Sequence, residues 1–195
     1  IQLMRYKDKN KIEALHQAVI DVIISEGYQN LSVAKIAKKA GVSQATLYVY
    51  YSDKKAMLGQ VYLNVKNLID TKLFAKVNPT GSVAEQFRLI LHNYADAITT
   101  YPREAAVMRV FNWNPDLLPP AIFQIGMDFG QPIQQIYQKG IQENSLRPLA
   151  PELLIAYTFQ PLDVIEELRF RHQQTMTKAE IDTMIEMAWQ ACRQN

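Results

Sequence analysis

The chain has 195 residues, of which 48% are hydrophobic and 21% are charged, with one cysteine and a formal net charge of +2. This composition is typical of a globular protein and excludes a largely disordered chain, because it offers enough apolar surface to form a core. The one cysteine, Cys192, excludes an internal disulfide, and no apolar run approaches the roughly 20 residues that cross a bilayer, so the sequence predicts a cytoplasmic protein without a membrane partner.

Charge is unevenly distributed along the chain. Residues 1–60 carry nine Lys or Arg and five Asp or Glu, which gives +4, whereas residues 61–195 carry twelve and fourteen, which gives −2. A basic N-terminal part suits a polyanionic partner such as DNA. A solvated lysine face explains the same distribution equally well, so the charge alone leaves both interpretations open.

The first part of the chain is predicted to form short helices in close succession. The first helix has its apolar residues at Ile12, Leu15, Val19, Val22 and Ile23 and ends at Gly27. Ser32 is a candidate N-cap for a helix over 33–40, and Ser43 for a helix over 44–50. A turn at Gly41 joins these two helices. Two short helices joined by a tight turn with glycine indicate a helix-turn-helix, whose second helix can enter the major groove of DNA.

Residues 31–58, with the sequence LSVAKIAKKAGVSQATLYVYYSDKKAML, resemble the DNA-binding domain of the TetR family of bacterial regulators. The resemblance rests on the Ala-Gly-Val-Ser turn, the Thr-Leu-Tyr core of the second short helix, the Tyr50-Tyr51 pair and the lysine that begins the next helix. It is strong over residues 8–60 and weaker beyond. It implies an all-helical homodimer with a ligand pocket inside its C-terminal bundle, opened by movement of the helix that begins at Lys54.

The resemblance also implies which residues meet DNA. The matching positions, which contact mostly phosphates and a few bases, are Gln44, Ala45, Thr46, Tyr48 and Tyr50, with Lys54 on a phosphate. The predicted DNA site further includes Ser32, Val33 and Ser43, at the starts of the two short helices. Ala45 is often glycine in the family and Tyr50 is often histidine, so the base preference need not follow that of a relative.

The chemistry of these side chains independently suits DNA. Gln44 has a donor and an acceptor that can pair with adenine, while Ala45 and the methyl group of Thr46 can touch a thymine methyl. Tyr48 can donate to a phosphate, and Lys54 adds a positive charge at the start of a helix. The alternative for Gln44 and Thr46 is an exposed helix surface without a partner.

Two residues of this region are predicted to have packing or surface roles. Tyr51 lies four positions after Leu47 on one helix face, so both are expected to join the core of the N-terminal helices. His16 is expected at the surface or at a domain contact. Only Glu13 and His16 show the Glu-x-x-His spacing, and a di-iron site in a helical bundle needs two such pairs.

The remaining chain shows helical periodicity as well. Further helices are predicted over 54–75, 83–101, 103–112, 121–144 with a bend at Pro132, 151–173 and 177–193. We therefore expect an all-α fold. A helix-turn-helix domain of three helices over 1–53 precedes a bundle of about six helices over 54–195, which senses a ligand and dimerises.

Aromatic and methionine side chains are frequent in the predicted bundle, and they suit a flat or apolar ligand. The candidate ligand-binding residues are Tyr62, Phe87, Tyr94, Met108, Phe111, Trp113, Phe123, Met127 and Tyr137. For each of them, packing in the core is the alternative. Polar residues that could orient a ligand, or could lie at the surface, are Asn93, Asn112, Asp128 and Gln160.

The last two predicted helices are apolar on more than one side. A helix at a protein surface needs only one apolar face, so the second face is expected to meet a partner subunit. The candidate dimer residues are Leu154, Tyr157, Ile165, Ile181, Met184, Ile185 and Ala188.

Two other classes of function fit the sequence less well. A helical enzyme is disfavoured because the chain has no HExxH, no GxSxG and no phosphate-binding glycine loop, and its histidines (His16, His92 and His172) are far apart in sequence. No catalytic residue, cofactor or metal is therefore expected. The second class is a relative of such regulators that has lost DNA binding and binds only other proteins. It is disfavoured because the chain keeps side chains that suit DNA, at Gln44, Thr46, Tyr48 and Lys54. We expect a ligand-responsive repressor that a small apolar or aromatic effector releases from a palindromic operator in double-stranded DNA.

Overall fold

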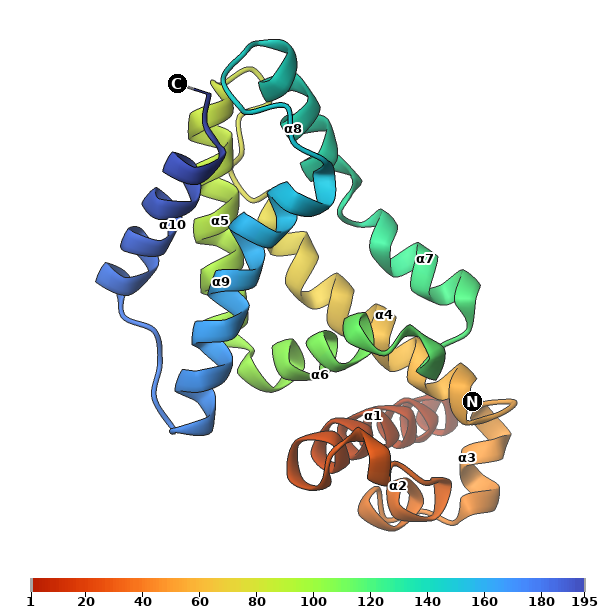
Figure 1. Ribbon diagram of the computed structural model, residues 1–195. Helices are drawn as coiled ribbons and strands as arrows, with labels where there is room; N and C mark the ends of the chain where they lie inside the picture. The colour runs from red at the N-terminus through yellow and green to blue at the C-terminus, as the bar shows by residue number, and fades with distance from the viewer. Residues whose placement is uncertain (1, 195) are drawn as a thin grey trace. The chain divides into compact units, whose positions relative to one another are not determined.

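The computed structural model describes the backbone of residues 2–194 and the side chains of residues 9–194 (Figure 1). Within residues 2–194 it contains ten α-helices, two short 3-10 helices and no strand beyond an isolated bridge between Leu146 and Arg193. The α-helices are α1 (Gln2–Glu26), α2 (Val33–Lys39), α3 (Gln44–Tyr50), α4 (Lys54–Leu73), α5 (Val83–Thr100), α6 (Pro102–Trp113), α7 (Pro120–Asp128), α8 (Gln131–Gln142), α9 (Pro151–Arg171) and α10 (Lys178–Cys192). The prediction of an all-α fold is confirmed.

The chain divides into two compact units. The first unit comprises Ile1–Val65 and Arg103–Gly126, and the second comprises Lys66–Pro102 and Met127–Asn195. Helix α4 therefore contributes its first part to one unit and its last part to the other. These units reflect packing, whereas the predicted boundary between residues 53 and 54 separates functions and stays a prediction.

Helices α1, α2 and α3 pack together in the first unit (Figure 1). Their buried side chains include Leu15, Val19, Val22, Ile36, Ala37 and Leu47. Ser32 Oγ accepts a hydrogen bond from the Lys35 N–H at 3.2 Å, and Ser43 Oγ accepts one from the Thr46 N–H at 3.1 Å. Both serines thus cap their helices as predicted, because they satisfy a backbone donor that the first turn leaves free. Between the helices, Gly41 has a φ of 68°, which glycine adopts without strain.

The first unit also contains an aromatic cluster around Tyr62 of α4. The Tyr62 hydroxyl donates to Asn112 Oδ1 on α6 at 3.0 Å. Its ring meets the edge of Phe111 and stacks on Phe123 of α7, with 5.9 Å between ring centroids in each pair. Gly126 on α7 lies against the same tyrosine ring. This cluster joins α6 and α7 to the first part of α4.

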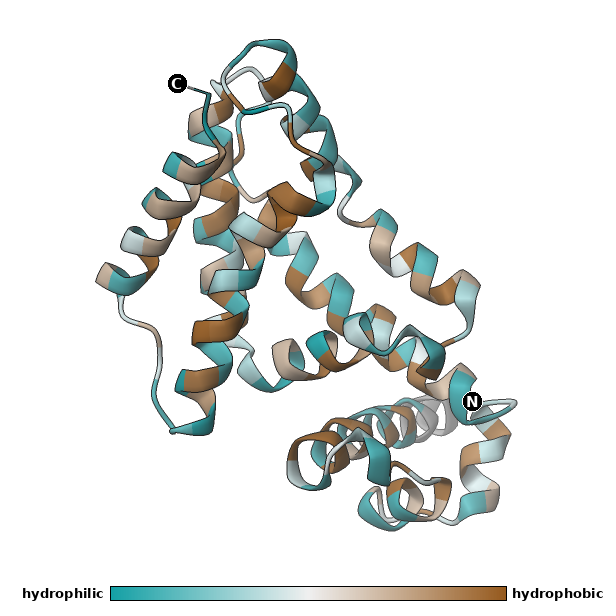
Figure 2. Ribbon diagram, in the orientation of Figure 1, coloured by the Kyte–Doolittle hydropathy of each residue, from teal (hydrophilic) through white to brown (hydrophobic). Residues whose placement is uncertain are grey.

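In the second unit, α5 packs against α8, α9 and α10. Ser82 with Glu85 and Thr177 with Glu180 form capping boxes that begin α5 and α10. Phe87 of α5 meets the edge of Trp189 of α10, with 5.2 Å between the ring centroids. Figure 2 shows hydrophobic and hydrophilic residues interspersed along α9 and α10, which is typical of helices with one buried face.

One predicted helix is wrong. The segment 121–144 forms two helices, α7 and α8, instead of one helix bent at Pro132. Pro132 lies in the first turn of α8, where the missing backbone N–H removes no helical hydrogen bond. A proline inside a helical pattern therefore marked the start of a new helix here, and the bundle has one helix more than predicted.

The contact between Gly126 and Tyr62 generates a prediction about stability. A Cβ atom at position 126 would lie 2.3 Å from Tyr62 Cε1, which forces the ring or the helix to move. The helix propensity of alanine favours Gly126→Ala by about 1 kcal/mol, whereas overpacking a core costs about 1 to 3 kcal/mol. We expect Gly126→Ala to lower the free energy of unfolding by about 1 kcal/mol, measured by urea denaturation. In a Tyr62→Leu background the same change should be neutral or stabilising, and an equal loss in both backgrounds would exclude this clash as the cause.

Candidate nucleic-acid interface and ligand pocket

Helix α3 buries one side chain and exposes most of the others. Leu47 is fully buried, whereas Tyr48 and Val49 are 54% and 76% exposed. Ser43, Gln44 and Ala45 are exposed as well, and Thr46 and Tyr50 are half-buried. The α3 residues that the sequence assigns to DNA contact are therefore all at least partly exposed, and Leu47 anchors the helix to the first unit.

The hydroxyl of Thr46 is held by the N-cap of its own helix. Thr46 Oγ1 lies 2.9 Å from Ser43 Oγ in a hydrogen bond between the two hydroxyls. This bond occupies polar groups of both residues. The methyl group of Thr46 is therefore the part left to touch a base, and the expected thymine contact stays a prediction.

Lys54 has a partner that sequence reasoning missed. Its Nζ donates to the backbone carbonyl of Leu31 at 3.1 Å, which ties the start of α4 to the residue before the Ser32 cap. Asp53 Oδ1 accepts from the Ala56 N–H at 2.8 Å and so caps α4. A lysine ammonium has three donors, so this bond leaves donors for a phosphate.

His16 and Tyr51 are joined by a hydrogen bond that sequence reasoning also missed. His16 Nε2 lies 2.6 Å from Tyr51 Oη, and His16 Nδ1 lies 3.0 Å from Asn64 Nδ2 on α4. Burial lowers the pKa of His16 despite the nearby Glu13 carboxylate, and burial raises the pKa of the Tyr51 phenol. Tyr51 is half-buried, and the centroid of its ring lies 6.0 Å from that of the His16 ring.

The candidate ligand-binding residues fall into both units. Those in the first unit are Tyr62, Met108, Phe111, Trp113 and Phe123, and those in the second are Phe87, Tyr94, Met127 and Tyr137. Tyr62, Phe111 and Phe123 pack against one another, as the core alternative allowed. Trp113 and Met127 are 71% and 45% exposed. Neither unit by itself brings the full predicted set together.

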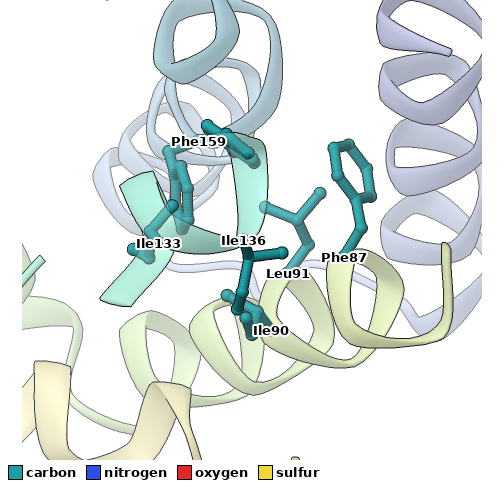
Figure 3. Close-up of a pocket in the computed structure, with 7 residues that line it drawn as sticks. Phe87, Ile90, Leu91, Ile133, Ile136 and Phe159 are labelled. Carbon is teal, nitrogen blue, oxygen red and sulfur yellow. The ribbon is translucent and has the colours of Figure 1, made fainter. Parts of the chain in front are cut away.

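A small apolar cavity lies within the second unit (Figure 3). It is lined by Phe87, Ile90 and Leu91 of α5, Ile133, Ile136 and Tyr137 of α8, and Phe159 of α9. Phe87 and Tyr137 belong to the predicted ligand set, while the aliphatic residues and Phe159 were not predicted. The cavity volume is about 10 Å³, which is room for about one water molecule. A ligand therefore requires the side chains of α5, α8 and α9 to move apart.

A buried polar pair adjoins this cavity. Tyr137 Oη lies 2.8 Å from Thr158 Oγ1, and Thr158 Oγ1 donates to the Leu154 carbonyl at 2.7 Å. Burial raises the pKa of Tyr137, so its phenol stays protonated at neutral pH. The two hydroxyls bond each other beside the cavity, whose own surface is apolar.

A larger cleft lies at the ends of α5 and α9 in the second unit. Its volume is about 300 Å³, within the range of small-molecule sites, and it contains none of the predicted ligand residues. Its lining residues are Thr99, Pro102, Glu166, Arg169, Phe170, Gln173, Gln174 and Thr175.

Polar residues that could have oriented a ligand have other partners. Asn93 Nδ2 donates to the carbonyls of Leu73 and Ala75 at 2.8 and 2.9 Å, and so satisfies the end of α4. Asn112 accepts from Tyr62, and Gln131 donates to Asp128 at 3.3 Å. Gln160 is exposed on α9. Asn93 and Asn112 therefore serve the fold in this structure.

The candidate dimer residues are divided between core and surface. Leu154, Ile181, Ile185 and Ala188 are buried within their own chain, Ile165 and Met184 are half-buried, and Tyr157 is exposed. The buried residues belong to the core of the second unit because α9 and α10 turn these faces toward each other and toward α5. The exposed apolar residues of these helices are instead Leu153, Tyr157, Val164 and Leu168 on α9 and Met187 on α10.

Among residues 9–194, no group of three or more His, Cys, Asp or Glu side chains could hold a metal ion. No helix in the described part of the chain is both long and apolar enough to cross a membrane.

Two family models match this chain. One, described as bacterial regulatory proteins of the tetR family, matches residues 17–61, and the other, described as a tetracyclin repressor-like C-terminal domain, matches residues 82–193. The fatty acid metabolism regulator protein of Bacillus subtilis strain 168 is 32% identical over 91 residues, which cover 43% of this chain and 47% of that relative. The chain thus spans less than half the length of this curated relative.

Solved structures share the fold over nearly the whole chain. A TetR family transcription regulator from Marinobacter aquaeolei VT8 matches with a TM-score of 0.85 at 24% identity, covering 98% of this chain and 100% of that protein. The transcriptional regulator FadR from Bacillus subtilis, in complex with stearoyl-CoA, matches with a TM-score of 0.70 at 20% identity, covering 90% and 96%.

Proposed function

The chain belongs to the TetR family of bacterial regulatory proteins, and we propose that it is a repressor that a small apolar effector releases from a palindromic DNA operator. The observation that carries the proposal is the surface of α3, which is anchored by Leu47 and exposes Gln44, Ala45 and Tyr48. A short helix with exposed polar side chains at its start suits the major groove.

The DNA contacts in this proposal divide into base contacts and phosphate contacts. Gln44 reads a base pair through its amide, and Ala45 and Thr46 contact a thymine methyl. The remaining residues fix the position of α3 on the backbone without reading sequence, and they are Ser32, Val33, Ser43, Tyr48, Tyr50 and Lys54. The bond from Lys54 to the Leu31 carbonyl supports this role, since it holds the lysine beside the start of α2.

The proposed dimer follows from the small size of the recognition helix. One helix of seven residues contacts few base pairs, so two copies related by a twofold axis are needed to read a palindrome with tight affinity. The exposed apolar residues Leu153, Tyr157, Val164 and Leu168 recur along α9 at spacings that suit one helix face. We propose that this face, with Met187 of α10, meets its symmetry mate in a four-helix bundle.

The proposed effector is apolar. The cavity between α5, α8 and α9 is lined by Phe87, Ile136, Phe159 and other apolar side chains, so its expansion would create an apolar pocket. The solved FadR structure in complex with stearoyl-CoA supports this class of ligand for a related fold. We propose that an acyl chain or a ligand of similar chemistry enters here, and that the resulting shift of the bundle moves α4 and weakens DNA binding.

Base reading and phosphate contact can be separated by mutation. Gln44→Ala should relax the preference at one base pair per half-site and cost about 1 to 3 kcal/mol on the preferred sequence, since the amide distinguishes bases.

Lys54→Ala should weaken specific and nonspecific binding alike and lower the salt slope by about one unit, because a phosphate carries no base information. Gel-shift titrations at several salt concentrations measure both. Lys55→Ala is the matched control. An equal change of affinity and salt slope in that variant would show that Lys54 acts only through its general positive charge and not through a specific phosphate contact.

The dimer proposal predicts different outcomes for exposed and buried positions. Val164→Glu places a charge on the exposed face of α9, so we expect monomers by sedimentation with an unchanged helical spectrum and a loss of tight operator binding. Glu152→Lys, on another face of α9, should remain dimeric. Ile185→Glu, at a position only 2% exposed, should unfold the second unit instead of releasing monomers. Dimers that persist in Val164→Glu at micromolar concentration would place the interface elsewhere.

The effector proposal is tested with stearoyl-CoA. A ligand at a hundredfold excess over its Kd stabilises the native state by about 2.7 kcal/mol, so we expect the melting temperature to rise by about 5 to 10 °C and bound DNA to be released. Coenzyme A without the acyl chain is the control and should have no effect. Ile136→Asn places an amide on the apolar wall, so it should weaken the response to stearoyl-CoA while leaving DNA binding intact. An equal response to free coenzyme A would contradict an apolar site.

A further inference from the structure

His16 lies where three parts of the first unit meet. Its Nε2 lies 2.6 Å from the Tyr51 hydroxyl, at the end of α3, and its Nδ1 lies 3.0 Å from the side-chain amide of Asn64 on α4. The imidazole thus connects α1, the proposed recognition helix and α4 through both of its ring nitrogens. Neither family resemblance nor the DNA contacts proposed above assigns a role to this histidine.

The neighbours of the ring determine where its proton sits. Gln60 Nε2 donates to Asn64 Oδ1 at 3.0 Å, so the amide NH₂ of Asn64 is the group that faces His16. His16 Nδ1 must then accept, because an NH₂ group has only donors. The neutral ring therefore carries its proton on Nε2 and donates it to the Tyr51 oxygen.

Tyr51 connects the hydrogen bond from His16 to helix α3. Its backbone N–H donates to the Leu47 carbonyl at 3.1 Å, so Tyr51 is the residue that ends the helix. A ring held by His16 therefore holds the last turn of α3, which contains the exposed Tyr48 and the half-buried Tyr50. On the other side, Asn64 belongs to α4, which continues to Leu73.

We infer that His16 is a positioning residue for DNA recognition, which in its neutral form fixes the end of α3 to α4 through Tyr51 and Asn64. The inference rests on the proposed function, in which α3 enters the major groove. A helix that is free to tilt at its C-terminal end presents Gln44 and Tyr48 less accurately, so the link favours the geometry that binds DNA. Since His16 itself meets no base, it affects affinity without affecting base preference.

Protonation of His16 breaks this arrangement. The groups that face the ring are the Glu13 carboxylate on the same helix, the Tyr51 phenol and the Asn64 amide, and burial lowers the pKa of the ring below its ordinary value of 6.5. A second proton would sit on Nδ1, where it meets the donor of Asn64. As the pH falls from 6.5 toward the lowered pKa, a loosened state takes up a proton that the linked state does not, so the linked state loses stability.

The test compares variants on a DNA duplex that the wild-type protein selects from a random library. We expect His16→Ala and Tyr51→Phe each to weaken binding about five- to tenfold at pH 7.5, without change in the selected base sequence, and the double variant to lose no more than either single one. His16→Gln keeps a donor for Tyr51 but takes up no proton, so it should retain most of the affinity. His172→Ala, at an exposed position in the second unit, is the control and should bind like wild type.

The pH profile and the protonation state separate positioning from general stability. Between pH 7.5 and 5.5 the affinity of the wild type should fall more than that of His16→Gln, and nitrogen NMR should find the His16 proton on Nε2. Asn64→Asp should raise the pKa of His16, because a carboxylate replaces the amide donor. The inference would be overturned by any of three results. They are parallel pH profiles for the wild type and His16→Gln, additive losses of affinity in the His16 and Tyr51 double variant, and a His16 proton on Nδ1. Wild-type protein that selects no sequence at all would instead overturn the proposed function, while the NMR result would still report on the link.

Discussion

The structure of the proposed DNA surface depends on holding a helix that is too short to be stable alone. Helix α3 has seven residues, well below the about 12 to 15 at which an isolated helix becomes marginally stable. Its shape is maintained by the Ser43 cap at one end, the burial of Leu47 in the middle and the Tyr51 bond to His16 at the other end. Leu47 is the one buried side chain of α3, so most of the helix is exposed to solvent.

Local signals allowed this part of the structure to be predicted from sequence. The Ser43 cap and the Gly41 turn act over three or four residues, and the predicted helix over 44–50 agrees with α3. The bond between His16 and Tyr51 could not be predicted in the same way, because it joins residues 35 positions apart. The sequence offers only a histidine on one predicted helix and a tyrosine at the end of another, and such a pair does not by itself predict a contact.

The second unit shows what periodicity cannot distinguish. An apolar stripe predicts that a helix face is covered, but not whether the cover is the same chain, a second copy or a ligand. Ile181 and Ile185 are covered by their own chain, whereas Val164 and Leu168 remain exposed on a helix with the same kind of pattern. Aromatic residues behave likewise, since Tyr62 joins a packed cluster while Phe87 lines a cavity. These assignments depend on contacts between distant segments, which a single sequence does not contain.

The chemistry of the contacts around α3 suits a protein that meets a polyanion. Binding to DNA releases counterions and falls steeply with salt, and an exposed ion pair between helices would be screened under the same conditions. The links that hold the ends of α3 are hydrogen bonds between neutral groups, from Ser43 to the backbone and from His16 to Tyr51 and Asn64. Lys54 likewise bonds a neutral carbonyl and leaves its charge unmatched by that contact. Because these links are uncharged, salt should affect them less than it affects the proposed phosphate contacts.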